Sequence, residues 1–267
     1  MDKAWMHRAD RDKRCLLAVH AHPDDETLTT GGTLARYAAE GVRTVVVTCT
    51  QGELGLPGDR SRELEAAANV LGVARLVQLG YADSGMQAEN AGPEAFHRIE
   101  PAEAATRLIE VLEEEQPQVV VTYDETGGYG HPDHVKAHQV TVAACRRWAH
   151  GRLYFVSFPL TWSRRFVAAL RRAGIDAPGS APAGADAGPE VEEIGVPDER
   201  VTTRIDVRAY VDTKRKALAC HGSQVGPDHF LGPAPADLLH ALWAYEYFER
   251  VGPRPRRLEE DLFAAGR

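Results

Sequence analysis

Short apolar runs alternate with amphipathic stretches along the first two thirds of the chain. The apolar runs have the length and β-branched content of buried strands, and they cover 15–20, 44–48, 75–79, 119–123 and 153–158. The stretches between them carry apolar residues at helical spacing, over 31–41, 61–72, 101–117, 134–149 and 164–173. Such alternation predicts an α/β fold with a mostly parallel, doubly wound sheet flanked by helices.

The last third departs from this pattern. Residues 174–198 are rich in Gly, Ala, Pro and acidic residues and have no apolar period, which predicts a mobile loop. Beyond it we expect a strand over 201–207, a helix over 211–221 and an aromatic-rich amphipathic helix over 235–250. We expect residues 1–267 to form a single domain with this part as a C-terminal extension.

Composition narrows the range of partners. The 267 residues carry a formal net charge of -8 without a long run of Lys or Arg, which argues against nucleic acid. The N-terminus is polar, and no run of eighteen apolar residues occurs, so we expect a cytoplasmic protein without a membrane partner. Four scattered cysteines argue against disulfides and a thiolate zinc site. A small-molecule substrate fits best, and a homo-oligomer stays open.

Two clusters of histidine and acidic residues follow predicted strands. The strand over 15–20 runs into HAHPDDE (20–26), and the strand over 119–123 runs into DETGGYGHPDH (124–134). Open parallel sheets place their ligand crevice at the carboxyl ends of the strands. We therefore expect the two clusters to meet at one edge of the sheet.

The residue types in these clusters suit a hydrolytic metal site. A catalytic zinc has three protein ligands and one position open to water, whose pKa it lowers to about 7. His22, Asp25 and His134 can supply such a set. Asp24 is then the available carboxylate to accept a proton from the water. The set also accepts other divalent metals such as Fe2+.

Amide hydrolysis further needs a donor to the oxyanion and a proton for the leaving amine. His131 suits either task, and Tyr129 is a second candidate donor. A purely structural alternative is that Asp24 or Asp25 caps the first helix and that His131 or Asp133 caps the later one. The presence of both clusters at strand ends of one sheet favours the functional interpretation.

Other histidines lack a partner pattern. We expect surface or packing roles for His7, His97, His150, His229 and His240. His138 follows His134 by one helical turn, which predicts a supporting or core position in preference to a second ligand. Gly31 and Gly32 form no phosphate-loop motif, so nucleotide binding is set aside.

The motifs AHPDDE and GGYGHPDH resemble those of the PIG-L/LmbE-like family of zinc-dependent N-deacetylases. The segments TCTQGELG, RSRELEAAANVLGV and YADSGM extend the resemblance over most of the chain. It implies a Rossmann-like fold and removal of an acyl group from a glucosamine nitrogen. It also implies the roles given above for the ligands, base and stabilisers, and it implies substrate contacts by Arg60 and Asp83.

Two branches of the family resemble this chain in different segments. Residues 201–225 with EDLF are similar to mycothiol S-conjugate amidase, whereas YADSGM is similar to the sister N-acetylglucosaminyl deacetylase. Leu56 replaces an acidic residue that is usual in these branches, and the connection to Arg60 is short. The leading hypothesis is hydrolysis of an N-acetyl group on a small glucosamine conjugate, in mycothiol or related natural-product metabolism. The alternatives are cleavage of a cysteinyl-glucosamine amide, and a non-catalytic metal-containing module that binds glycoconjugates.

Overall fold

A single sheet organises the chain. The computed structural model describes residues 14–55, 58–175, 194–226, 229, 231 and 234–264. Its seven-stranded sheet has the order β3-β2-β1-β4-β5-β7-β6. The strands are β1 Cys15–His20, β2 Arg43–Thr50, β3 Arg75–Tyr81, β4 Val119–Tyr123, β5 Arg152–Ser157, β6 Thr203–Asp206 and β7 Tyr245–Arg250. β1 to β5 pair in parallel, and β7 runs antiparallel to both β5 and β6. The mostly parallel sheet predicted from the sequence is confirmed.

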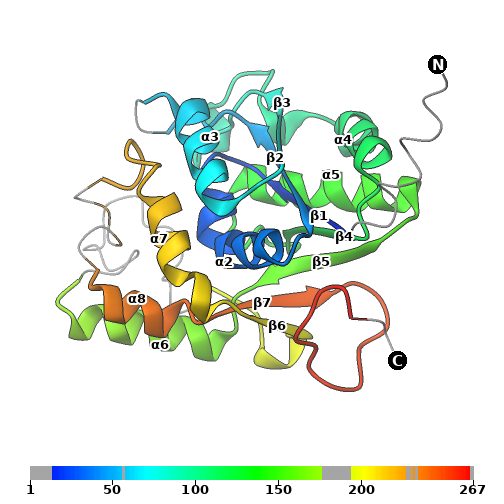
Figure 1. Cartoon of the computed structure of the whole chain (residues 1–267). Helices are drawn as coiled ribbons and strands as arrows, with labels where there is room; N and C mark the ends of the chain where they lie inside the picture. Colours follow the sequence, from blue (N-terminus) through cyan, green and yellow to red (C-terminus); the bar gives the residue numbers. More distant parts are fainter. Residues whose placement is uncertain are drawn as a thin grey trace, which may run out of the picture.

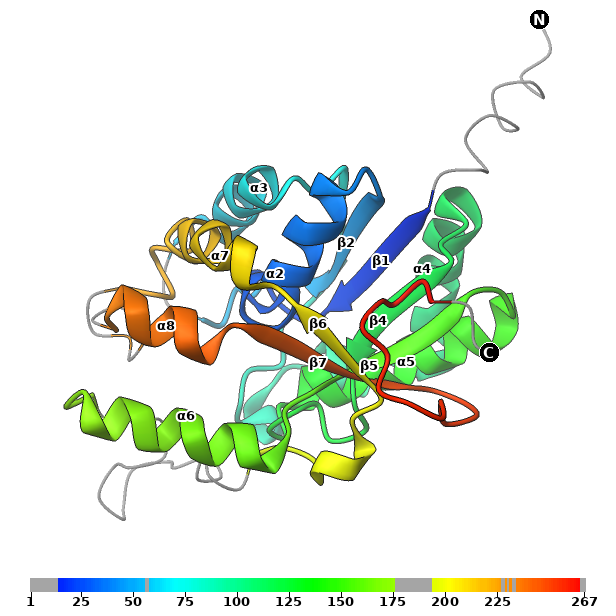
Figure 2. The same ribbon diagram turned by 60° about the horizontal axis from the view of Figure 1, so that its bottom comes forward.

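Helices cover both faces of the sheet (Figure 1). They are α2 Asp25–Ala39, α3 Arg60–Leu71, α4 Pro101–Glu115, α5 Pro132–Trp148, α6 Leu160–Arg172, α7 Val211–Leu218 and α8 Ala236–Leu242. α4 and α5 pack on one face, while α2, α3 and α7 lie on the other. α6 and α8 lie next to each other beside the antiparallel edge, where Figure 2 shows them most clearly. Short 3-10 turns cover Ala88–Asn90, Phe96–Arg98, Asp198–Arg200 and Arg208–Tyr210.

Successive residues of β1 pack alternately into the two hydrophobic clusters on opposite faces of the sheet. Leu17 and Val19 point toward α4 and α5, whereas Leu16 and Ala18 point toward α2 and α3. All six residues of β1 are buried because both faces of the strand are covered. The central strand therefore delivers the residues that follow it to a fixed place at the carboxyl edge.

Two expected elements differ in the structure. α2 begins at Asp25, ahead of the expected start at residue 31, so the acidic residues of the first cluster lie in its first turn. The expected helix over 235–250 is confirmed only in its first half, where α8 lies, and is wrong in its second half, where β7 follows. In β7 Glu246 and Phe248 are buried while Tyr245 and Tyr247 are half-buried, which is the alternation of a strand. Aromatic residues in this pattern favour β structure over a helix.

Most of the expected loop over 174–198 lies outside the described residues, since 176–193 are not among them. No described helix has both the length and the apolar character needed to cross a membrane.

Candidate active site

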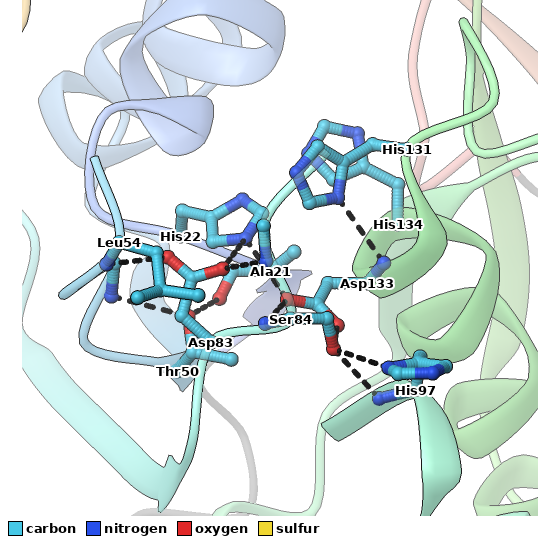
Figure 3. Close-up of polar contacts among 12 residues, drawn as sticks. Ala21, His22, Thr50, Leu54, Asp83, Ser84, His97, His131, Asp133 and His134 are labelled. Atoms are coloured by element: carbon cyan, nitrogen blue, oxygen red, sulfur yellow. Dashed lines mark hydrogen bonds and ion pairs between the residues drawn. The ribbon is translucent and has the colours of Figure 1, made fainter. Parts of the chain in front are cut away.

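The two histidine and acidic clusters lie together at a switch point of the sheet. β1 pairs with β2 on one side and with β4 on the other, so the strand order reverses between β1 and β4. Ligand crevices of open α/β sheets form outside the carboxyl ends of such strands. The ring centroids of His22, after β1, and His131, after β4, are 4.6 Å apart. The structure thus places the two clusters together, as Figure 3 shows for His22, His131 and His134.

One cavity of about 470 Å³ is lined by all the residues that the sequence predicted as ligands, catalytic groups or substrate contacts: His22, Asp24, Asp25, Arg60, Asp83, Tyr129, His131 and His134. The large apolar side chains of Leu54 and Met86 line the same cavity and are largely exposed. A concave site with several convergent polar groups is typical of small-molecule binding.

Asp25 lies between two imidazoles at the floor of the cavity. Its Oδ2 is 3.3 Å from Nδ1 of His22 and 3.4 Å from Nε2 of His134. The backbone N–H of His22 also donates to this oxygen, at 2.9 Å. The side chain of Asp25 therefore contacts His22 and His134 and does not cap α2. Two nitrogens and one carboxylate oxygen from three buried residues face one another here.

This donor set fits a divalent metal ion. Nε2 of His134 is buried and has no hydrogen-bond partner among the described residues, which is costly unless another partner binds it. Nδ1 of the same ring lies 3.1 Å from the carbonyl oxygen of Gly127, and this contact fixes the ring orientation. Two groups of three residues that share His22 also bring their ligand atoms within 4.8 Å of one another: His22 with His131 and His134, and His22 with Asp83 and Asp133. The cluster is therefore able to bind a metal.

A glycine turn makes the contact to His134 possible. Gly127 has φ +68°, and a Cβ there would approach the Cβ of His134 to 2.7 Å. Only glycine combines this conformation with such a close approach. Tyr129, which follows in the same turn, is 40% exposed, and its ring centroid lies 5.0 Å from that of His134.

Asp24 is held in an unusual backbone conformation with its side chain at the cavity. Its φ is +112°, a region that a residue with a side chain rarely adopts, at a cost of about 1–3 kcal/mol. It precedes α2 but makes no capping hydrogen bond. Burial raises the pKa of its carboxyl to about 7, and the charge of Asp25 acts in the same direction while Arg60 opposes both. The group is suited to exchange a proton near neutral pH.

His131 does cap a helix, as the structural alternative allowed. Its Nδ1 accepts a hydrogen bond from the backbone N–H of Asp133 at 3.1 Å, at the start of α5. An accepting Nδ1 carries no proton, so the proton of the neutral ring is on Nε2. Burial lowers the pKa of His131 to about 4, and the neighbouring His22 and His134 add to this effect. The ring therefore offers a neutral N–H donor and remains compatible with a functional role.

Arg60 and Asp83 make protein contacts in addition to lining the cavity. The Arg60 guanidinium donates to the carbonyl oxygens of Gly52 and Pro23 at 2.7 and 2.5 Å, and to Oδ2 of Asp24 at 3.2 Å. The carboxylate of Asp83 accepts backbone N–H bonds from Leu54 and Gly85. These contacts orient the loops around the cavity, and the expected contacts to substrate stay predictions.

A second layer behind His22 was missed from the sequence. Nε2 of His22 lies 3.2 Å from Oδ2 of Asp133, which also accepts from the Ser84 backbone N–H at 2.8 Å (Figure 3). Ser84 Oγ bonds the other Asp133 oxygen, and Nδ1 of His97 lies 2.9 Å from Ser84 Oγ. His97 is thus tied to the site instead of being a simple surface residue. Asp133 was considered only as a possible helix cap, although its place inside the second motif next to His134 was a signal for a role at the site.

Tyr123 and His138 are two further residues next to the site. Tyr123, the last residue of β4, stacks on His134 with ring centroids 4.2 Å apart, and its hydroxyl accepts from the Ala21 backbone N–H. The sequence signal that could have identified Tyr123 is its place at the end of a predicted strand. His138 does not line the cavity, and its Nδ1 lies 2.9 Å from the Tyr123 carbonyl oxygen. This is the supporting position expected for it.

Comparisons with known proteins identify the family of this chain. The family described as "PIG-L: GlcNAc-PI de-N-acetylase" matches residues 17–145. The 1D-myo-inositol 2-acetamido-2-deoxy-alpha-D-glucopyranoside deacetylase of Thermobifida fusca is 42% identical over 94% of this chain and 99% of the relative. The enzyme of the same name from Acidothermus cellulolyticus is also 42% identical, over 94% of both chains.

A solved structure supports the fold. The N,N'-diacetylchitobiose deacetylase from Pyrococcus horikoshii aligns with a TM-score of 0.57 at 21% identity, over 90% of this chain and 85% of that one. At this level of identity the likeness supports the architecture alone.

Proposed function

Because the chain belongs to the PIG-L family of de-N-acetylases, we propose that it hydrolyses the N-acetyl amide of a glucosamine unit in a small glycoconjugate. The relatives named above act on an N-acetylglucosaminide of 1D-myo-inositol, and we propose the same class of substrate here. The observation that carries this proposal is the buried set of His22, Asp25 and His134, with Asp24 and His131 beside it in one cavity.

We propose that His22, Asp25 and His134 hold one zinc ion. Their two nitrogens and one carboxylate oxygen are the ligand types of a catalytic zinc. The buried Nε2 of His134, which has no hydrogen bond among the described residues and lies 3.4 Å from Oδ2 of Asp25, supports the assignment. A bound zinc lowers the pKa of a water to about 7 and polarises the amide carbonyl. Metal analysis of the purified protein distinguishes zinc from iron, which the same ligand types accept.

Asp24 acts as the proton acceptor in this proposal. Its carboxylate lines the cavity but lies outside the proposed ligand set, and its pKa near 7 suits transfer of a proton from the attacking water. Arg60 holds one carboxylate oxygen of Asp24, so the other is left to face the water. The same proton then passes to the departing amine, which leaves as glucosamine while acetate is released.

His131 stabilises the oxyanion through Nε2–H. Because Nδ1 is held as an acceptor by the Asp133 backbone N–H, Nε2 carries the proton of the neutral ring and can donate it in a hydrogen bond. A donor already in place when charge develops on the carbonyl oxygen lowers the barrier without reorganisation. We assign Tyr129, which is partly exposed at the cavity, as a second donor that contacts the substrate.

A substrate panel tests the proposal. Acetate release is measured with N-acetylglucosaminides that differ in the aglycone, alongside a cysteinyl-glucosamine amide that reports the amidase alternative. We expect acetate release from the inositol glycoside to have the highest kcat/KM. Preferred cleavage of the cysteinyl amide would assign the chain to the amidase branch, and binding without turnover of any amide would make it a binding module.

A further inference from the structure

Asp24, the residue assigned as the base, is held by hydrogen bonds of its backbone as well as by contacts of its side chain. The backbone N–H of Asp24 donates to Oε2 of Glu26 at 2.9 Å, two residues further along the chain. Asp24 has φ +112°, and a residue keeps such a conformation only when its surroundings fix it. The hydrogen bond to Glu26 is one of these constraints. Others are the contacts of Arg60 to the Pro23 carbonyl oxygen and the Asp24 carboxylate, and the backbone N–H bonds that the Asp24 carbonyl oxygen accepts from α2.

Glu26 is itself oriented from a distant part of the chain. Its side chain is fully buried, and Oε1 lies 2.8 Å from Nε2 of His221, which is fully buried as well. Thr27 Oγ1 donates to the same oxygen at 2.5 Å. Both carboxylate oxygens of Glu26 are therefore engaged, one by Asp24 and one by His221 and Thr27. Such a side chain has little freedom to move.

The turn that carries His221 is fixed on both sides. It follows α7, which packs against α2 and α3 (Figure 1). The His221 carbonyl oxygen accepts from the backbone N–H groups of Gln224 and Val225 at 2.9 and 2.8 Å. Ser223 donates from its backbone N–H and its hydroxyl to Glu63 of α3, at 2.8 and 2.6 Å. His221 is thus presented to Glu26 by a rigid turn.

We propose that His221 and Glu26 form a positioning pair, which acts through the Asp24 backbone N–H to hold the Asp24 carboxylate at the cavity. The proposal rests on the proposed function, in which Asp24 accepts the proton. Neither His221 nor Glu26 lines the cavity, so neither touches the substrate. Both act on the rate through the position of Asp24.

The first test replaces His221 by Leu, which has no donor, and by Gln, whose side-chain N–H can still donate to Glu26. A small misplacement of a catalytic group costs about 10²-fold in rate. We expect kcat of His221→Leu to fall about 10²-fold with KM and zinc content close to the parent values. His221→Gln should stay within about tenfold of the parent, since the donor is kept. Equal losses in the Leu and Gln variants would overturn the proposal.

The decisive measurement repeats His221→Leu in an Asp24→Asn background. If His221 acts through Asp24, then the second substitution should change the residual rate less than about threefold, because the base is already missing. A further loss of about 10²-fold in that background would show a general structural role and overturn the proposal. Full activity of Asp24→Asn alone would instead refute the assignment of the base, so the two failures are distinguishable.

Two additional variants distinguish a lost positioning role from a loss of stability. Glu26→Gln keeps the size of the side chain but has one oxygen, which cannot accept from Asp24 and from His221 in the present arrangement. We expect its kcat to fall by a similar factor even where His221→Leu does not fold. Phe248→Leu, a fully buried substitution in β7 away from the cavity, is the control for lost stability and should keep the parent kcat. Unchanged kcat in folded Glu26→Gln would contradict the proposal.

Discussion

A buried ion pair beneath the site allows a quantitative prediction of stability. Lys214 of α7 and Glu246 of β7 are 2% and 5% exposed, and Nζ lies 2.7 Å from Oε1. The carboxylate also accepts the backbone N–H groups of Gly32 and Thr33 in α2, at 2.9 and 2.8 Å. Nζ donates to the carbonyl oxygen of Leu28 in the same helix. The pair thus connects α7 and β7 to α2.

Glu246→Gln should destabilise the protein strongly. It removes the negative charge but leaves the Lys214 ammonium buried, and its amide N–H2 has to face one of the two backbone donors of α2. Loss of one partner of a buried pair costs about 3–5 kcal/mol. For a chain of this size each kcal/mol corresponds to about 2–4 °C, so we expect the melting temperature to fall by about 10 °C.

Two matched variants make the prediction sharper. Lys214→Met should cost less than Glu246→Gln, because the carboxylate keeps its hydrogen bonds from Gly32 and Thr33. Glu40→Gln breaks the more exposed pair with Arg36 on the same helix and should cost about 0.5 kcal/mol or less. Thermal unfolding followed by circular dichroism gives all three values. A melting temperature of Glu246→Gln within about 2 °C of the parent would refute the reasoning.

Further predictions concern the metal and the catalytic groups. A chelator should abolish acetate release and zinc should restore it, whereas full activity in demonstrably metal-free protein would exclude a metal role. His134→Ala should lower bound zinc, measured by elemental analysis. Asp24→Asn should keep its zinc while kcat falls about 10²–10⁴-fold, and loss of metal would mean that Asp24 is a ligand. His131→Ala should lower kcat about 10²–10³-fold at unchanged metal content, and His131→Gln, which keeps an N–H donor, should retain more activity. Since the lowered pKa leaves His131 neutral above about pH 4, its Nε2–H donor is present in one form throughout the range from pH 6 to 8, and its contribution should not change with pH there. A rate that falls between pH 6 and 8 in the parent but not in His131→Gln would show a protonated acid instead.

The parallel part of the sheet could be predicted because its signals are local. The strand expected over 119–123 agrees with β4, since both its faces are buried and the whole run is apolar. The start of α2 was missed because its first turn contains Asp25 and Glu26, which read as a polar loop. Asp25 is buried against His22 in its own motif, and Glu26 is buried against His221. A partner as distant as His221 is invisible to local periodicity.

The strand β7 could not be separated from a helix by periodicity alone. The apolar residues of 235–250 fit one helical face, and the alternation in Tyr245–Arg250 is short. The sheet decides the outcome, because β5 presents an edge that needs a partner, and β7 pairs with it antiparallel from Tyr154 to Ser157. Tertiary pairing here overrides an ambiguous local pattern.

The candidate site also combines residues that a local motif identifies with partners that are distant in the sequence. His22, Asp24 and Asp25 occur in one short motif, and His131 and His134 in another, so their types and spacing suffice to propose chemistry. Their orientation depends on partners that sequence spacing does not reveal: Glu26 pairs with His221, 195 positions away, and Gly32 with Glu246, 214 positions away. Both distant partners belong to the C-terminal part of the chain, which contributes no residue to the proposed ligand set. Substitutions in that part should therefore alter rate or stability through α2 and the loop before it, while the metal ligands and the chemistry stay the same.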